Sequence, residues 1–518
     1  MEPIDALVTR LGRWSAGRGP LYLLLAARFR QLIDEGLLPP DTPLPADRRL
    51  AAALSVGRST VVAAYEALRQ EGRVVRRQGS GTRVASAAAL LPGPRVRETS
   101  NPLFLNLLEP SDGVILLSCA APLGPPPELT EAYRSLVLPE ADLGYHPAGL
   151  EALRAALAEK YAVRGVPTDP AQILVTTGAQ QALSLLTRLL VAPGDGVLVE
   201  APTYSGALDL FREAAAVPLP VRVGPDGVDV AEAIRMMERH RPALAYVVSR
   251  FQNPTGAVLP PLSGRRLVEA ANGLGVPLID DEARADLGFG ADPGVGVDPG
   301  MGVDPGFEED AAQKPWVTLC AYGDVLSVGS LSKPVWGGLR IGWVRGPAAT
   351  IARLARLKAI HDLGSDLPGQ LAAVRVLAGF APVLRDRLRN LREGHDHLVA
   401  ELARLLPSWT PAPTSGGQTL WVRLPYGDGV AFAQVALRHG VAVLPGSTMD
   451  ALGGSVRYLR LHFLLPPEVL TEAVRRLAAA WREYAPGAAP RAVRGRAAVP
   501  APRGHFAVGT PALRPVVV

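Results

Sequence analysis

The chain has 518 residues, of which 48% are hydrophobic and 20% charged, and its net charge is +5. It contains two cysteines and no apolar run long enough to cross a bilayer, which excludes a disulfide scaffold, a cysteine-based zinc site and a membrane-spanning protein. The first residues lack the apolar core of a signal peptide. We therefore expect a cytoplasmic protein of two or three domains, with no metal site.

The charge is distributed unevenly along the chain. Residues 1–97 contain 15 Arg and 8 acidic residues, a net +7, and residues 485–518 contain 5 Arg and no acid, a net +5, which leaves −7 for the rest. A basic head on an acidic body indicates an anionic partner for the head, although a solvated arginine-rich surface would give the same numbers. The segment 485–518 is low in complexity, and we expect a disordered tail there.

Residues 15–85 are predicted to form a small helical domain that ends in a β-hairpin. Two short apolar stripes, at 50–54 and 61–68, are separated only by a turn of Ser-Val-Gly, which is the spacing of a helix-turn-helix. The basic stretch 73–84 alternates and turns at Gly-Ser-Gly, which indicates a hairpin, or wing. The second helix opens with residue types that contact phosphates and base edges in the major groove.

This combination resembles the winged-helix domain of the GntR family of transcriptional regulators, over about residues 20–84. The resemblance implies double-stranded operator DNA as the partner of the head. For Arg48, one of the DNA contacts that the resemblance implies, a surface ion pair is the alternative role. Gly57 stands where relatives usually have Ser or Thr, and this difference removes a helix cap. The DNA contacts that the resemblance implies are Arg48, Arg58, Ser59 and Thr60, with Gln78 and Gly79 at the tip of the wing.

Residues 113–484 follow a linker at 86–112 and alternate short β-like runs with amphipathic helices. This alternation predicts an α/β domain with a mostly parallel sheet. Residues 291–306 repeat the unit Gly-Val-Asp-Pro-Gly, and we expect a low-complexity surface insertion there.

Two segments of this domain suit a phosphorylated aldehyde. The sequence Thr-Thr-Gly follows a strand and opens a helix, so the backbone N–H groups at its start could hold a phosphate. Lys333 would form a Schiff base with the aldehyde. A hydroxyl and a guanidinium flank this lysine and could bind the same phosphate. The phosphate ligands that we expect are Gly178, Ala179, Gln180, Ser330 and Arg340.

Three further segments suit a pyridine ring. Tyr204 ends one strand, where its ring could stack on a planar cofactor. Asn253 ends another strand in the sequence Asn-Pro-Thr-Gly. An aspartate at 280 or 281 could hold a proton on the pyridine nitrogen and make the ring an electron sink. The five elements in this order predict pyridoxal 5'-phosphate.

Residues 113–484 resemble the class I aminotransferases of fold type I, and their fusion to the head resembles the MocR subfamily of GntR regulators. The resemblance implies a mainly parallel seven-stranded sheet, a smaller C-terminal α/β subdomain, and a homodimer in which the head of one chain lies over the body of the other. It also implies Lys333 as the catalytic lysine. It favours Asp281 over Asp280, because Asp281 lies 28 residues after Asn253.

The resemblance identifies Arg460 as the arginine that binds an effector carboxylate, for which the guanidinium fork is suited. Arg457 is the competing choice, and a structural salt bridge is the other role open to Arg460. Arg284 departs from the family, since most relatives have a tyrosine there that hydrogen-bonds the phenolic oxygen of the cofactor. An arginine could donate to that oxygen or point away, and either makes full aminotransferase turnover less expected.

We therefore expect a pyridoxal-phosphate-dependent transcriptional regulator that senses the cofactor, an amino compound or both through an aldimine at Lys333. One alternative is a functional aminotransferase that carries a DNA-binding head, and residual transaminase activity stays open. Another is a DNA-binding protein on an inactive scaffold. A dimer with two heads predicts an operator with two half-sites.

Overall fold

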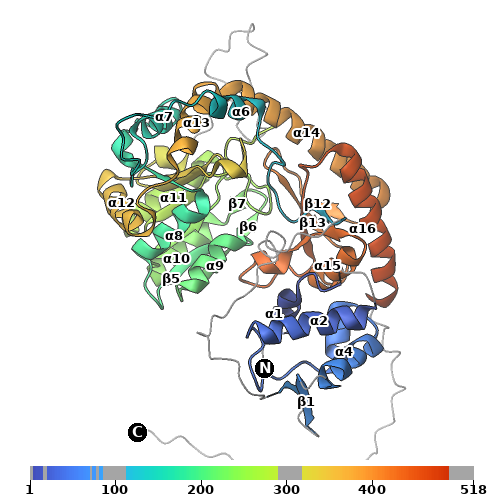
Figure 1. Cartoon of the computed structure of the whole chain (residues 1–518). Coiled ribbons are helices and arrows are strands. Elements are labelled where there is room, and N and C mark those ends of the chain that lie inside the picture. The colour runs from blue at the N-terminus through green and yellow to red at the C-terminus, as the bar shows by residue number, and fades with distance from the viewer. Residues whose placement is uncertain are drawn as a thin grey trace, which may run out of the picture.

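The computed structural model describes residues 4–15, 20–70, 73–77, 81–85, 113–289 and 318–488. Figure 1 shows three parts: a large α/β domain, a smaller C-terminal domain beside it, and a head beneath the smaller domain. The predicted linker and insertion lie outside the described residues, as does most of the predicted tail.

The head contains a helix-turn-helix followed by a hairpin. Leu50 and Leu54 of the first helix and Val61 and Leu68 of the second are fully buried in one core, as the two apolar stripes predict. Ser55 ends the first helix in the left-handed conformation, with φ 52°. The winged helix-turn-helix prediction is confirmed. The elements are α2 (Leu21–Asp34), α3 (Asp47–Leu54), α4 (Arg58–Gln70), β1 (Val74–Arg77) and β2 (Gly81–Val84).

One helix of the head lies before its predicted start. Helix α1 (Ile4–Leu11) buries Leu7, Val8 and Leu11 in the same core as α2, α3 and α4. Its three buried residues follow the i, i+1, i+4 spacing of an apolar helix face, although the helix has only eight residues.

The large domain is built on one sheet with the strand order β4-β11-β10-β9-β8-β5-β6-β7. Strand β11 is antiparallel to both neighbours and β7 to β6, while the other pairs are parallel. The prediction of a mainly parallel sheet is confirmed, and the two-residue β7 is an additional edge strand, because Pro225-Asp226-Gly227 turns the chain back (Gly227 φ 85°). The strands are β4 (Ile173–Thr176), β5 (Gly196–Ala201), β6 (Val217–Gly224), β7 (Gly227–Val228), β8 (Leu244–Val247), β9 (Leu278–Asp281), β10 (Leu326–Ser330) and β11 (Gly342–Arg345).

Helices cover both faces of this sheet, and alternate strand residues enter two different cores. On β9, Leu278 belongs to the core under one layer of helices, and Ile279 to the core under the other. Asp281 therefore points to the same face as Ile279, and Asp280 to the opposite face. The first layer contains α6 (Pro127–Arg134), α7 (Glu151–Ala162), α10 (Val230–His240), α11 (Pro261–Leu274) and α13 (Leu367–Ala378), and the second contains α8 (Ala179–Leu190), α9 (Ser205–Glu213) and α12 (Ala348–Asp362).

The smaller domain packs helices on an antiparallel sheet with the order β12-β13-β16-β15. Strand β3 (Ile115–Leu116) pairs with β14 (Val441–Ala442), which brings the residues after β3 to this domain. No single described helix could span a membrane by length and apolarity, and α13 with α14 passes that test only as a pair bent by 84°. The other elements are α14 (Phe380–Leu405), β12 (Thr410–Pro411), β13 (Thr419–Arg423), α15 (Gly429–Arg438), β15 (Leu444–Pro445), β16 (Tyr458–His462) and α16 (Pro467–Ala488).

Candidate functional site

Asp281 and Asp280 have different surroundings. Tyr246 of β8 donates a hydrogen bond to Oδ2 of Asp281 (2.8 Å), and the N–H of Ala283 donates to Oδ1 (3.0 Å). Burial raises the pKa of Asp281, and these two hydrogen bonds oppose that rise. Asp280 accepts instead from the N–H and hydroxyl of Ser249. The geometry favours Asp281 as the partner of a pyridine nitrogen, because it shares a face and neighbours with the other candidate residues.

Lys333 follows β10 in a short turn and is partly buried. Its Nζ donates to the carbonyl oxygen of Ala120 (2.7 Å). Burial lowers the pKa of Lys333 to about 8, and the nearby guanidinium of Arg284 adds to the effect. An amine with this pKa is partly neutral near pH 7 and can attack an aldehyde.

A phosphate could bind where α8 begins. Gly178 has φ +133°, and a Cβ at this position would lie 3.0 Å from Nη2 of Arg340, so a side chain would fill the space that Gly178 leaves free. The exposed Arg340 donates to the carbonyl of Gly337 (3.2 Å). Gly178, immediately before the N-terminus of α8, thus lies beside a guanidinium, an arrangement suited to a phosphate. Ser330 is buried at the end of β10, where its Oγ accepts from the N–H of Ser332 (3.1 Å).

The side chain of Gln180 holds Tyr204 in place, a role that the sequence did not indicate. Tyr204 donates to Oε1 of Gln180 (3.0 Å), and Nε2 of Gln180 donates to the carbonyl of Gly206 (3.0 Å). A Cβ at Gly206 would lie 2.5 Å from the tyrosine ring, so glycine is needed there. Burial raises the pKa of Tyr204 to about 12, and nearby Asp281 also raises it.

Arg460 lies on β16 and is buried, whereas Arg457 is exposed. Nη1 of Arg460 donates to Oδ1 of Asn253 (3.2 Å), Nη2 donates to the carbonyl of Ser118, and Nε has no partner among the described residues. Burial lowers the pKa of Arg460 to about 10. The geometry favours Arg460 over Arg457 as a carboxylate ligand, because only Arg460 faces the other candidate residues.

Arg284 points into the site and not away from it. Its Nη1 donates to the hydroxyl of Thr419 on β13 (3.1 Å), and the side chain is buried. Burial lowers the pKa of Arg284 to about 9, and the proximity of Arg460 adds to that effect. Two buried guanidinium groups therefore lie near Lys333 in this part of the site.

Sequence reasoning missed several residues that hold the site together. Tyr246 sits inside a buried strand with no polar neighbour to mark it, and the carbonyls of Ser118 and Ala120 carry no side-chain signal. Glu200, at the end of β5, accepts from Nε2 of Gln252 (2.9 Å) and from the N–H of Val248 (3.2 Å). Among these residues, only Glu200 could have been identified from the sequence, because it is an acidic residue at the end of a buried strand.

The pKa of Glu200 predicts a dependence of the stability of the protein on pH. Burial raises the pKa of Glu200 to about 8, from 4.5. Between these two pKa values the folded chain retains the proton of Glu200, whereas the unfolded chain releases it. The contribution of Glu200 to the free energy of unfolding is therefore complete below about pH 4.5 and is lost as the pH rises through 8, at about 1.4 kcal/mol per pH unit. We expect Glu200→Gln to unfold at higher urea concentration than the wild type near pH 8.5, with a smaller difference near pH 5.5. The exposed Glu238→Gln is the control, and a difference independent of pH would contradict this account.

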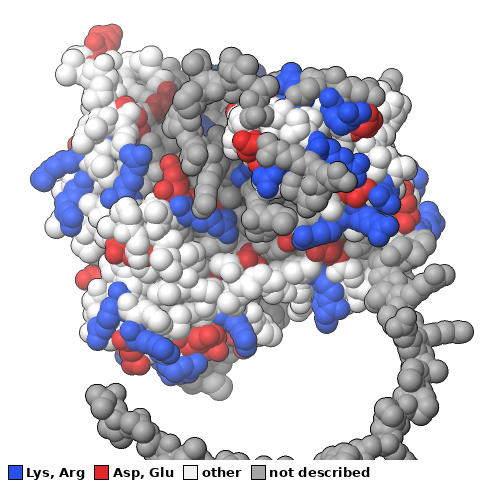
Figure 2. Space-filling view, turned by 90° about the horizontal axis from the view of Figure 1, so that it is seen from below, with Lys and Arg blue, Asp and Glu red and all other residues white. Residues whose placement is uncertain are grey.

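Three of the side chains expected to contact DNA are exposed on the head, those of Arg48, Arg58 and Ser59. Arg58 begins α4 and pairs with Asp47 of α3, with Nε to Oδ2 at 2.7 Å, and this hydrogen bond lowers the pKa of Asp47. Thr60 is partly buried. Figure 2 views the molecule from below and shows groups of basic side chains with acidic ones between them. Gln78 and Gly79 lie outside the described residues.

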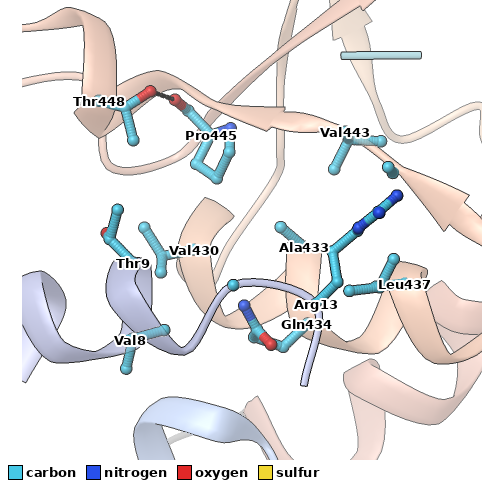
Figure 3. A pocket seen from close by; sticks show the side chains of 12 residues that line it. Val8, Thr9, Arg13, Val430, Ala433, Gln434, Leu437, Val443, Pro445 and Thr448 are labelled. Atoms are coloured by element: carbon cyan, nitrogen blue, oxygen red, sulfur yellow. Dashed lines mark hydrogen bonds between the residues drawn. The ribbon is translucent and has the colours of Figure 1, made fainter. Parts of the chain in front are cut away.

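The head contacts the small domain directly through α15. Arg438, at the end of α15, donates to the carbonyl of Leu54, the last residue of α3 (3.3 Å), and to that of the C-cap Ser55 (3.1 Å). It also pairs with Glu483 of α16 (3.0 Å). Val430 of α15 belongs to the core of the head. A cavity of about 50 Å³ lies between α1 and α15, and Figure 3 shows Thr9 on one side of it and Ala433, Gln434 and Leu437 on the other.

Comparison with known proteins agrees with this architecture. Residues 112–477 match the model of the aminotransferase class I and II family, and residues 21–84 match that of the bacterial regulatory proteins of the gntR family.

The chain belongs to the class I and II aminotransferase family.

Its relatives include enzymes and regulators. It is 31% identical to the 2-aminoadipate transaminase of Thermus thermophilus, over 65% of this chain and 81% of that protein. It is 28% identical to the uncharacterized HTH-type transcriptional regulator YisV of Bacillus subtilis, over 85% of this chain and 92% of that protein. It is also 28% identical to the uncharacterized HTH-type transcriptional regulator YdcR of Escherichia coli, over 85% of this chain and 94% of that protein. A GntR head fused to an aminotransferase body is the MocR-type arrangement, which confirms that resemblance.

Solved structures indicate the cofactor. The α-aminoadipate aminotransferase LysN of Thermus thermophilus, complexed with N-(5'-phosphopyridoxyl)-L-leucine, superimposes with a TM-score of 0.62 at 29% identity, over 72% of this chain and 94% of that one. The cofactor of the aminotransferase-like body is pyridoxal 5'-phosphate. The residues present fit it, because Gly178 leaves space beside Arg340 for a phosphate and Arg460 has a buried Nε without a partner among the described residues.

Proposed function

We propose that this protein is a transcriptional regulator in which pyridoxal phosphate at Lys333, together with an amino compound, sets the affinity of the head for DNA. When bound, the cofactor supplies an aldehyde that amines can join and a ring that withdraws electrons. Lys333 Nζ is the attachment point, Asp281 would hold the proton of the ring nitrogen, and Arg460 would orient an incoming carboxylate. The role of each of these residues is part of the proposal.

The contact of Arg438 with the end of α3 is the observation that carries this proposal. Arg460 lies on β16, which pairs with β15 through Leu444. Strand β15 also borders the cavity at the head, where Pro445 and Thr448 face α1. A ligand held by Arg460 therefore acts on the domain that contacts the helix-turn-helix. It changes DNA affinity to the extent that it binds one domain arrangement better than the other.

DNA binding of the full-length protein tests the proposal. An operator is first selected from random duplexes, and its Kd is then measured with and without pyridoxal phosphate and a panel of amino acids. We expect cofactor and one class of amino acid to change the Kd together. A Kd indifferent to both would refute the regulatory proposal. Repeated turnover with a 2-oxo acid, without any change in Kd, would instead favour an aminotransferase that carries a DNA-binding head.

Replacing Arg58 by alanine is expected to weaken operator binding by about 1–3 kcal/mol, because a guanidinium in the first turn of α4 is placed to contact base edges or phosphates. The wild-type Kd should also rise more steeply with salt than that of the variant. Arg69→Ala, at the other end of α4 and paired with Glu66, is the matched control. Equal binding by both variants would show that α4 does not enter the DNA through Arg58.

We also propose that the protein is a homodimer. Several large apolar side chains around α6 are strongly exposed, among them Leu143 (91%) and Val137 (79%). An apolar surface of this kind favours burial against another chain. Two copies would bring two heads to one operator, which accords with a site of two half-sites. Sedimentation of the full-length protein, and of Leu143→Glu, tests this proposal.

A further inference from the structure

Two buried arginines in the site form no direct ion pair with a carboxylate in the described part of the chain. Arg284 is 5% exposed and Arg460 is 2% exposed. Their hydrogen-bond partners are neutral oxygens, from the Thr419 hydroxyl, the Asn253 amide and the Ser118 carbonyl. Burial of a cation without a directly paired anion is unfavourable, so the two arginines favour a ligand that supplies negative charge.

The two guanidinium groups lie on the same side of the small sheet. Thr419, which accepts from Arg284, pairs with His462 across β13 and β16, and Trp421 pairs with Arg460. Because paired residues and alternate residues share a face, Thr419, His462 and Arg460 all face the site. Arg284 also lies near Lys333, since its charge helps to lower the pKa of that amine. Arg284 thus reaches from the large domain to the strands that hold Arg460.

The charges of the site do not balance without a ligand. Lys333, Arg284 and Arg460 are basic, whereas Asp281 is the one acid placed among them in the described residues. Burial lowers the pKa of His462 to about 4, so this side chain is neutral near pH 7. In the proposed function the carboxylate of Asp281 pairs with the ring nitrogen, and the phosphate lies apart, beside Arg340. Arg284 and Arg460 then remain for the incoming amino compound.

We propose that Arg284 and Arg460 together select an amino acid with an acidic side chain, one arginine for each carboxylate. This inference rests on the proposed function. A monocarboxylic amino acid would neutralise one guanidinium and leave the other buried and unpaired. An amide in place of the second carboxylate would keep the size of the ligand and lose its charge, and sites that bind a polar group reject analogues without it. Arg284 is thus a specificity-determining residue.

The visible absorption of the full-length protein loaded with pyridoxal phosphate reports this selection. The protein is titrated with L-aspartate and L-glutamate, and with L-asparagine and L-glutamine as their respective neutral counterparts. We expect the best acid to bind at least about tenfold more tightly than its amide, which corresponds to one buried ion pair. In Arg284→Gln we expect the preference to fall to about twofold or less, through weaker binding of the acid and unchanged binding of the amide.

Two further variants separate charge from structure. Arg284→Lys retains a cation and should recover part of the preference, which a merely structural role would not predict. Arg457→Gln removes an exposed arginine three residues before Arg460 and should leave all the affinities unchanged. Thermal melting and operator binding without amino acid establish that each variant is folded.

The outcomes separate this inference from the proposed function. Equal binding of acids and amides by the wild type would overturn the inference and leave the regulator intact. A changed spectrum of Arg284→Gln before any amino acid is added, with the acid preference retained, would assign Arg284 to the phenolic oxygen of the cofactor and would also overturn it. A protein that shows no visible band with pyridoxal phosphate would refute the proposed function, and the inference with it.

Discussion

Replacing Lys333 by alanine is expected to abolish covalent attachment of pyridoxal phosphate. The reason is that Nζ of Lys333 is the amine placed among Asp281, Tyr204 and Arg460, and its pKa, lowered to about 8, leaves part of it neutral near pH 7. The wild type should show a visible band that borohydride bleaches, with the label retained on the peptide that contains Lys333. Lys333→Ala should show neither the band nor the label.

The pH dependence of the uptake adds a second readout. The rate of attachment should rise with pH up to about 8 and level off above it, since the neutral amine is the nucleophile. Pyridoxamine 5'-phosphate, which carries an amine in place of the aldehyde, is the control ligand and should leave no borohydride label on either protein. A labelled Lys333→Ala would mean that another lysine holds the cofactor, and the proposed site would then be wrong.

Loss of Lys333 should also change how the cofactor affects DNA binding. In Lys333→Ala, operator affinity should no longer respond to low concentrations of pyridoxal phosphate, while the affinity of the head itself stays within about twofold. The head and the large domain, which holds Lys333, have separate cores, so removal of one side chain from the large domain leaves the helix-turn-helix folded. A normal cofactor response without Lys333 would show that the cofactor acts elsewhere.

The sequence predicted those features that local patterns encode. Apolar spacing located α3 and α4, and the alternation of strands and helices predicted the mainly parallel sheet. The choice of Asp281 over Asp280 came from the resemblance to the family. The structure favours the same residue, because neighbouring residues of a strand face opposite layers, and Ile279 and Asp281 share the layer that contains Tyr246. Chain order also indicated which strand ends would lie near one another, since parallel strands place their carboxyl ends at one edge of the sheet.

The remaining features depend on contacts between distant residues, which leave no local pattern. The direction of Arg284 is set by Thr419, 135 residues away. Gln180 was predicted as a backbone ligand of phosphate, yet its side chain meets Tyr204, which depends on the space beside Gly206. The docking of the head depends on Arg438, more than 380 residues beyond α3. In each case a side chain satisfies a group brought near it by tertiary packing, and residue type alone does not indicate which group that is.

Replacing Arg438 by alanine is expected to uncouple the head from the body. In the wild type we expect the effective amino acid to change operator Kd by about 5–150-fold, the usual range of coupling between two sites. Arg438 holds the carbonyl end of α3, immediately before the turn that leads to α4, and Glu483 fixes its guanidinium. Without that contact, movement of the small domain would no longer bias α4, and the change in Kd should fall to about twofold.

The test compares two variants by two measurements. Arg482→Ala removes an exposed arginine beside Glu483 and should retain the full change in Kd. Both variants should bind pyridoxal phosphate and the amino acid as the wild type does, because neither residue touches that site. Hydrogen exchange at the end of α3 should rise in Arg438→Ala alone, since its last carbonyls lose a charged donor that lies close to their helix terminus. If Arg438→Ala exchanges faster at α3 and yet keeps the whole response of the Kd, the contact with α15 stabilises the head without transmitting the signal. The body would then have to act through another surface, and the head of a second chain in the proposed dimer would be the first place to look for it.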